Sequence, residues 1–133
     1  MKNKFAKWQQ PKIIEGKPTK YNWLVQNVTG LKLGAMTDIG AFTYVNAKYG
    51  VEIDELAQIG SHCSIYSVST IDNKHGRVRI KRNACVGSHS VVMPGVTIGE
   101  NSVVGAFSFV NKDIPDNCLA LGIPAKVVRK FKQ

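Results

Sequence analysis

Residues 86–110 read VGSHSVVMPGVTIGENSVVGAFSFV, and within this stretch a Val or Ile returns every six positions. The same aliphatic series begins much earlier in the chain; its members are Leu33, Ile39, Val45, Ile53, Ile59, Ile65, Ile71, Ile80, Val86, Val92, Ile98, Val104 and Val110. Small residues stand four places after most of them: Thr37, Thr43, Ala57, Cys63, Ser69, Ala84, Ser90, Ser102 and Ser108. A helix repeats its apolar face near 3.6 residues and a strand near 2, so a period of six indicates one side of a three-sided coil. The aliphatic side chains are expected to fill the prism, with three hexapeptides making one turn of roughly eighteen residues.

Two breaks in the period predict loops. The step from Val45 to Ile53 is eight residues and the step from Ile71 to Ile80 is nine, so we expect excursions at 46–52 and 72–79. Insertions in a repeat protein become surface loops, and such loops commonly carry function. The expected organisation is an amino-terminal cap at 1–30, the repeat coil at 31–115 and a carboxyl-terminal tail at 116–133.

Length and composition fit one small domain. The chain has 133 residues, of which 44% are hydrophobic, and a thin prism buries less surface than a sphere, which favours oligomers. It has no apolar run near the ~18 residues that cross a bilayer, and residues 1–10 lack the hydrophobic region of a signal peptide. The three cysteines, Cys63, Cys85 and Cys118, form no Cys-x-x-Cys pair, which argues against a disulfide framework and a thiolate zinc site. We therefore expect a cytoplasmic protein without membrane insertion.

The net charge of +9 raises the question of a nucleic-acid partner. Lysines and arginines gather at both ends and in residues 74–82, but no nucleic-acid motif accompanies them. A basic surface also suits a phosphate-bearing substrate. We expect no nucleic-acid binding.

Residues 86–115, followed by 121–129 with the sequence LGIPAKVVR, closely resemble the hexapeptide-repeat acyltransferases. The resemblance is to galactoside, maltose and other sugar O-acetyltransferases and to small acetyltransferases of surface-polysaccharide synthesis. It implies an all-β fold, a left-handed parallel β-helix, and a homotrimer with active sites between subunits. It also implies acetyl-CoA as the acyl donor, with no metal required, and a sugar or nucleotide-sugar acceptor.

The same resemblance indicates which residues contact coenzyme A. Matching positions of the family motif are Ser88, Ala106, Asn111, Lys112 and Arg129, with Lys126 also near the tail. Ser88 and Ala106 are one coil apart, so they are expected to stack along one edge, as an extended pantetheine arm requires. Basic side chains in the set would meet its phosphates. Asn111 stands where the family usually has Thr.

Acyl transfer needs a base beside the attacking atom, and imidazole serves near neutral pH. The chain offers only His62, His75 and His89. His75 lies in the second excursion, sixteen residues after Ile59, close to the offset of the catalytic histidine in the sugar acetyltransferases. His75 is the candidate base, with Asp72 a candidate to orient its ring. The family's usual flanking residues are absent around His75, so His62 and His89 remain alternatives.

Asn46 opens the first excursion at the offset of a family asparagine that binds the acceptor hydroxyl. Its amide offers a donor and an acceptor to a substrate hydroxyl. Asp38 and Tyr49 are expected to line the same acceptor pocket. A plain turn residue is the competing interpretation of Asn46.

Three functions stay open from the sequence. The first is an acetyl-CoA-dependent acyltransferase acting on oxygen or nitrogen of a sugar. The second is a metal hydratase resembling the γ-type carbonic anhydrases, although the histidine gaps of 13 and 14 residues differ from that family's spacing. The third is a non-catalytic β-helix that serves as an assembly module.

Overall fold

The computed structural model describes residues 4–132, and its dominant feature is a prism of three parallel sheets. The first sheet contains β1 (Leu24–Gln26), β4 (Tyr44–Asn46), β7 (Ser64–Tyr66), β12 (Val91–Val92) and β15 (Phe109–Val110). The second contains β2 (Leu31–Leu33), β5 (Val51–Ile53), β10 (Val78–Ile80) and β13 (Thr97–Ile98). The third contains β3 (Asp38–Ile39), β6 (Gln58–Ile59), β11 (Cys85–Val86), β14 (Val103–Val104), β16 (Cys118–Gly122) and β17 (Ala125–Lys130).

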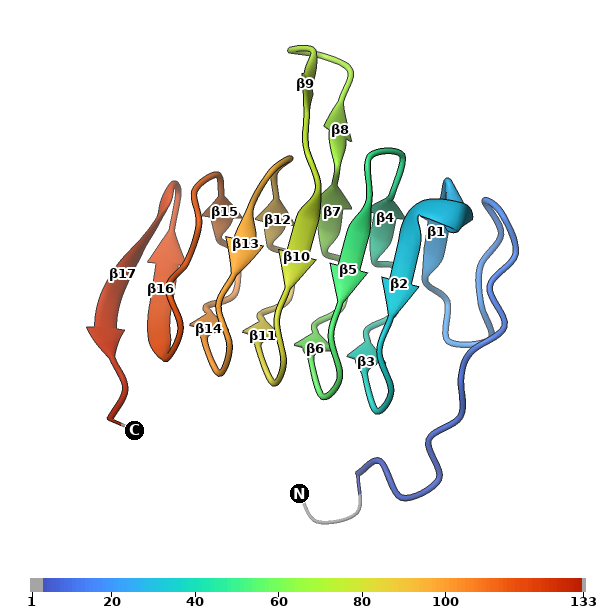
Figure 1. The fold of residues 1–133 in the computed structure, drawn as a ribbon, viewed down its shortest axis with the longest axis horizontal. Coiled ribbons are helices and arrows are strands. Elements are labelled where there is room, and N and C mark those ends of the chain that lie inside the picture. Colours follow the sequence, from blue (N-terminus) through green and yellow to red (C-terminus); the bar gives the residue numbers. More distant parts are fainter. Residues whose placement is uncertain (1–3, 133) are drawn as a thin grey trace.

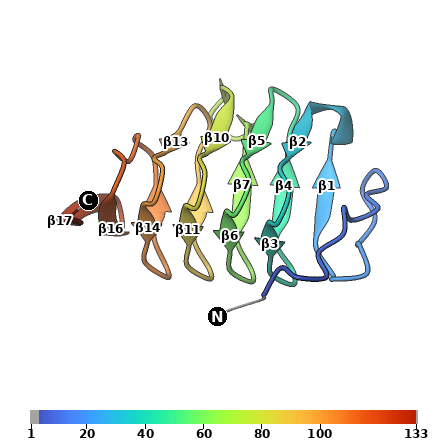
Figure 2. The same ribbon diagram turned by 60° about the horizontal axis from the view of Figure 1, so that its bottom comes forward.

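The coil winds in the left-handed sense. In Figure 1 the chain rises along the distant first sheet, crosses over the top to the near second sheet, descends, and returns underneath while it advances from right to left. Rotation and advance therefore have opposite hands, the reverse of the usual crossover between parallel strands. Figure 2 shows the successive coils side by side along the same axis. This is the handedness that the resemblance implied.

The aliphatic series forms three columns inside the prism. Val45 pairs in register with Val25 and Ile65, and Ile53 pairs with Ile80. These five side chains are at most 1% exposed. The small companions pack beside the columns at the corners, where Thr43 and Ser108 donate to carbonyls of Gly60 and Gly105. The six-residue period therefore predicted most of the core correctly.

Ile71 is the exception in the predicted core series, since its side chain is 98% exposed. Ile80 occupies the place in the second sheet that the period gave to Ile71, and Val78 lies beside Val51 in the same paired strands. Both valines are buried. Each strand has two buried apolar residues, Val51 and Ile53 in β5 and Val78 and Ile80 in β10. Both strands therefore begin two residues before the position that the period alone marked.

The loop and domain boundaries shift accordingly. The first excursion is residues 47–50, not 46–52, and the second is a hairpin of β8 (Val68–Ser69) and β9 (Lys74–His75), not 72–79. β1 pairs with β4 and therefore belongs to the coil, although it falls in the predicted cap of 1–30. β16 likewise extends the coil into the predicted tail. The tail then turns back as β17, antiparallel to β16.

Two edges of the prism carry several of the candidate residues named from the sequence. We call the corner between the first and second sheets the loop edge (residues 47–50, 67–77, 93–96 and 111–113). The corner between the third and first sheets is the ring edge (residues 40–43, 60–63, 87–90 and 105–108).

A short 3-10 helix, η1 (Val28–Gly30), lies in the first coil. No helix within residues 4–132 is long and apolar enough to span a bilayer.

Candidate functional site

His75 lies in the hairpin that projects from the loop edge, beside the turn between β4 and β5 (Figure 1). Its imidazole stacks on the Tyr49 ring, with centroids 4.5 Å apart and planes 23° from parallel. Lys48 places its ammonium 5.7 Å from the centre of the same Tyr49 ring. The two excursions predicted from breaks in the period therefore meet, and their contact is made by two aromatic rings.

Asp72 has other partners in the structure. Its carboxylate lies 3.6 Å from the Lys74 ammonium. The pKa of the Asp72 carboxyl lies below its ordinary value, chiefly because the Ser69 hydroxyl bonds to the ionised form, with Lys74 adding attraction. The contact that orients the His75 ring is with Tyr49, not with the acidic residue expected from the sequence.

Ser67 fastens the two excursions together at their base. Its hydroxyl donates to the Asn46 carbonyl at 2.7 Å and accepts the Tyr49 N–H at 3.0 Å. Its carbonyl accepts the Gly76 N–H at 2.9 Å, one residue after His75. The Ser67 side chain is fully buried, so water cannot easily replace these bonds. Sequence analysis missed Ser67; its signal was a small polar residue two places after the core residue Ile65, where the hairpin leaves the coil.

Asn46 ends β4 at the loop edge, close to this contact in the chain. Its side-chain oxygen accepts from Asn27 Nδ2 at 2.9 Å, and its own Nδ2 donates to the Tyr44 hydroxyl at 3.2 Å. The amide is thus held in one orientation at the end of the strand. The structure brings Asn46, Tyr49 and His75 to one edge, three residues that the sequence assigned to acceptor binding and proton transfer.

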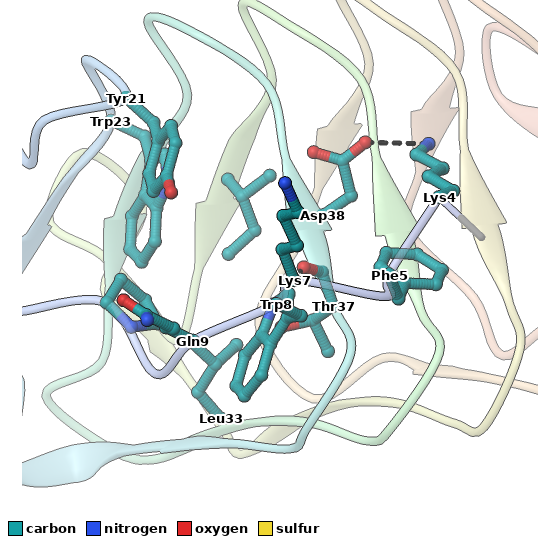
Figure 3. Close-up of a pocket in the computed structure, with 12 residues that line it drawn as sticks. Lys4, Phe5, Lys7, Trp8, Gln9, Tyr21, Trp23, Leu33, Thr37 and Asp38 are labelled. Carbon is teal, nitrogen blue, oxygen red and sulfur yellow. Dashed lines mark hydrogen bonds and ion pairs between the residues drawn. The ribbon is translucent and has the colours of Figure 1, made fainter.

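Asp38 lies elsewhere. It belongs to β3 on the third sheet, and its carboxylate accepts from the Lys4 ammonium at 2.8 Å (Figure 3). Within one subunit Asp38 and Asn46 therefore lie on different sheets of the prism, so a single chain does not bring them into one pocket. Asp38 instead lines a hollow beneath the amino-terminal arm.

Ser88 and Ala106 stack at the ring edge, as their spacing predicts. A Cβ added at Gly87 would lie 2.5 Å from the Ala106 nitrogen, so only glycine permits this close approach of successive coils. Within residues 4–132 the backbone N–H groups of Ser88 and Ala106 donate to no backbone carbonyl. They are therefore available to carbonyl groups of a bound ligand.

Four rings run along the ring edge beside Ser88 and Ala106. The order is Phe42, His62, His89 and Phe107, with centroid separations of 5.1, 4.7 and 4.8 Å. All four residues have positive φ. His62 and His89 are the alternative bases from the sequence. The structure stacks their rings face to face, 3° from parallel, on a different edge of the prism from His75. The repeated His three places after a core residue was the signal for this stack.

The remaining coenzyme A candidates lie in other places within one subunit. Asn111 and Lys112 follow β15 at the loop edge. Lys126 and Arg129 lie on β17, where Lys126 pairs in register with Leu121 near the ring edge and Arg129 with Leu119. The Gly122 N–H donates to Ser108 Oγ at 3.2 Å, which holds the tail turn against the ring edge. One subunit therefore does not gather the whole predicted set.

Among the described residues, few side chains are arranged for metal binding or for reaction as a thiolate. Within residues 4–132 no three His, Cys, Asp or Glu side chains gather as a set that could hold a metal ion. Burial raises the pKa of both the Cys63 and Cys85 thiols, which lowers their thiolate fraction at neutral pH.

Comparison with known proteins identifies similar sequences and structures. The family described as bacterial transferase hexapeptide (six repeats) matches residues 77–112, which include the ring-edge residues Ser88 and Ala106. Residues 77–112 of this chain thus carry hexapeptide repeats of that family. The galactoside O-acetyltransferase of Escherichia coli (strain K12) is 37% identical over 113 residues, covering 74% of this chain and 56% of that relative. This hexapeptide-repeat chain thus spans little more than half the length of that relative.

Solved structures agree with the repeat assignment. A hexapeptide-repeat acetyltransferase from Vibrio cholerae O1 biovar eltor, complexed with acetyl-CoA, superposes with a TM-score of 0.79 and 27% identity, covering 84% of this chain and 66% of that one. A galactoside acetyltransferase in complex with coenzyme A gives a TM-score of 0.74 and 27% identity, covering 83% of this chain and 60% of the other. The hexapeptide-repeat chain shares its left-handed β-helix with these acetyltransferases.

Proposed function

We propose that this chain transfers an acetyl group from acetyl-CoA to a hydroxyl or amino group of a sugar or nucleotide-sugar. The observation that carries the proposal is the contact of the His75 imidazole with the Tyr49 ring, at the same edge as Asn46. The β-helix that bears them is similar to that of an acetyltransferase solved with acetyl-CoA. The named activity of the Escherichia coli relative, galactoside O-acetylation, supports a sugar as acceptor.

The chain's residues have simple roles in this reaction. Asn46 holds the acceptor by its amide, and the His75 imidazole takes the proton from the attacking oxygen or nitrogen. The acceptor atom bonds to the thioester carbonyl carbon, the carbon–sulfur bond breaks, and the thiolate of coenzyme A receives the proton. Tyr49 and Ser67 are positioning residues, since they touch His75 or its supporting loop and not the reacting atoms.

Coenzyme A is assigned to the ring edge and the tail. The small side chains of Ser88 and Ala106 leave room for an extended pantetheine arm, and their backbone N–H groups are available to its carbonyls. Lys126 lies at the adjoining tail turn, where an ammonium can meet a phosphate.

A shared site follows from the separation of these groups. His75 lies on the loop edge and Ser88 on the ring edge, so one copy's base and another copy's donor site must meet for transfer to occur. We propose a homotrimer with active sites between subunits, in which the loop edge of one chain faces the ring edge of its neighbour. We also propose the cytoplasm as its compartment, because Cys63, Cys85 and Cys118 are all unpaired.

The test is a screen of neutral sugars, amino sugars and nucleotide-sugars with acetyl-CoA, measuring release of the free thiol. We expect turnover with at least one acceptor, and turnover about 10² to 10⁴ fold lower with His75→Ala under the same conditions. Added zinc and a chelator form a parallel arm, in which activity that needs the metal would point to hydration chemistry. Failure to bind acetyl-CoA in calorimetry would contradict the proposal and favour the assembly module.

A further inference from the structure

The amino-terminal arm, residues 4–12, encloses a hollow against the third sheet. Two contacts fix the arm there: Lys4 Nζ lies 2.8 Å from Asp38 Oδ2, and Trp8 Nε1 donates to the Thr37 carbonyl at 2.8 Å. The hollow between these contacts has a volume of about 250 Å³. This is below the roughly 300–1,000 Å³ of sites for drug-sized molecules, so the hollow suits a single ring.

Its two sides differ in chemistry, as Figure 3 shows. Tyr21 and Trp23 stand on one side, and Lys7 and Asp38 on the other, while Trp8 closes the bottom of the view. The floor includes the aliphatic residues Leu33 and Ile39. Aromatic faces offer a flat apolar surface with polar tips.

The hollow is lined by charges of both signs. Asp38 is held by Lys4 through one carboxylate oxygen, which leaves Oδ1 directed to other donors. Lys7 takes part in none of the ion pairs among residues 4–132. A cationic ligand would be repelled by the two ammonium groups and an anionic ligand by the carboxylate, whereas a neutral ligand meets neither repulsion.

A neutral polyhydroxylated ring matches both sides. Each hydroxyl is a donor and an acceptor, so it can donate to Asp38 and accept from Lys7. The C–H face of a pyranose is apolar and can pack on the Tyr21 ring. We propose that the hollow under the arm is a binding site for one neutral sugar ring, separate from the loop edge that carries His75. The proposal does not depend on acyl transfer, since binding here involves neither coenzyme A nor His75.

The chain supplies its own reporter for this site. It contains only two tryptophans, Trp8 and Trp23, and both line the hollow. Titration of the full chain with glucose, galactose and mannose should therefore give a saturable change in tryptophan fluorescence with at least one of them. Uridine monophosphate serves as the planar anionic probe and should give no saturable change.

Variants make the test specific. Tyr21→Ala should weaken sugar affinity by about tenfold through the lost ring face, while Ile14→Ala, an equally exposed apolar residue outside the hollow, should not. Lys7→Met should weaken binding and Lys17→Met should leave it unchanged; these four side chains are exposed, so the fold should tolerate the substitutions. His75→Ala should keep the fluorescence response even where it abolishes transfer.

Three results would overturn the assignment. They are no saturation with any neutral sugar, saturation with uridine monophosphate alone, and a sugar response that Tyr21→Ala and Lys7→Met leave intact. Loss of transfer in His75→Ala with an unchanged sugar response would keep the two proposals distinct.

Discussion

At the scale of single residues, His75, the proposed base, stacks on the Tyr49 ring, whereas an acidic side chain often orients a catalytic histidine. A face-to-face contact fixes the plane of the imidazole but leaves both ring nitrogens to other partners. Ser67 supports that contact from inside the fold, since its hydroxyl donates to the Asn46 carbonyl and accepts the Tyr49 N–H. The position of the proposed base thus depends on a buried hydroxyl and an exposed ring.

His75→Ala should lower kcat by about 10² to 10⁴ fold, the usual contribution of a general base. Affinity for acetyl-CoA should stay near that of the unaltered chain, because the proposed donor site lies at the ring edge, away from His75. Steady-state kinetics and calorimetry measure the two quantities, with His62→Ala as the matched control. Equal losses in His62→Ala and His75→Ala would contradict the assignment of the base.

Tyr49→Ala should lower kcat by a smaller factor than His75→Ala, because it loosens the imidazole without removing it. Tyr49→Phe keeps the ring and should retain most of the turnover. Proton NMR provides a readout that a structural role alone would not move: the ring-current shift of the His75 imidazole protons should vanish in Tyr49→Ala and persist in Tyr49→Phe. An unchanged His75 spectrum in Tyr49→Ala would show that the rings do not stack in solution.

At the scale of elements, the hairpin of β8 and β9 is an insertion that the coil tolerates because β10 resumes the register. Val78, Arg79 and Ile80 pair with the second coil residue for residue. Ion pairs from Arg79 to Asp54 at 3.1 Å and from Arg82 to Glu55 at 3.0 Å join the two coils just after the insertion. These exposed pairs each contribute modestly, about 0 to 1 kcal/mol, so the buried column holds most of the register.

Ile80→Ala should reduce the free energy of unfolding by about 2 to 5 kcal/mol, because it leaves a cavity among fully buried side chains. Ile71→Ala is the matched control, since that side chain lies at the exposed hairpin and should change stability by no more than about 0.5 kcal/mol. Denaturant unfolding at fixed chain concentration measures both. A larger loss in Ile71→Ala would place Ile71 in the core, as the six-residue period alone suggested.

At the scale of the whole molecule, the prism presents the proposed base and the proposed donor site on different edges. The loop edge carries His75 and Asn46, and the ring edge carries Ser88 and the four stacked rings. Phe42 and Phe107 at the ends of the stack are more than 60% exposed, which is a large apolar surface for one small chain. A symmetric assembly that faces one edge with the other would complete the site.

Mixing two inactive variants tests this assembly. His75→Ala removes the base from the loop edge, and Ser88→Trp blocks the donor site at the ring edge. Co-refolded in equal amounts, the two should recover about a quarter of the sites, because random mixing then joins an intact loop edge to an intact ring edge in that fraction. Sedimentation should show trimers throughout. Recovery that stays at zero, with trimers present, would place the whole site within one chain.

The sequence by itself determined the three-sided coil and most of its core. A six-residue period states which side chains point inward, because each sheet is built from short strands of fixed direction. Resemblance added the handedness, which Figure 1 shows, and the acyl donor, which stays a proposal supported by the acetyl-CoA complex of a similar acetyltransferase. The stack of Ser88 over Ala106 was also readable, since one coil separates the two.

Only the tertiary structure decided how the insertions settle and which side chains meet. Ile71 fits the period yet lies in solvent, because Val78 and Ile80 form the better pair with Val51 and Ile53. A period cannot choose between two such registers; the packing of alternate side chains in neighbouring coils does. The contact of Tyr49 with His75 and the separation of Asp38 from Asn46 depend in the same way on distances across the prism, which a linear pattern does not contain.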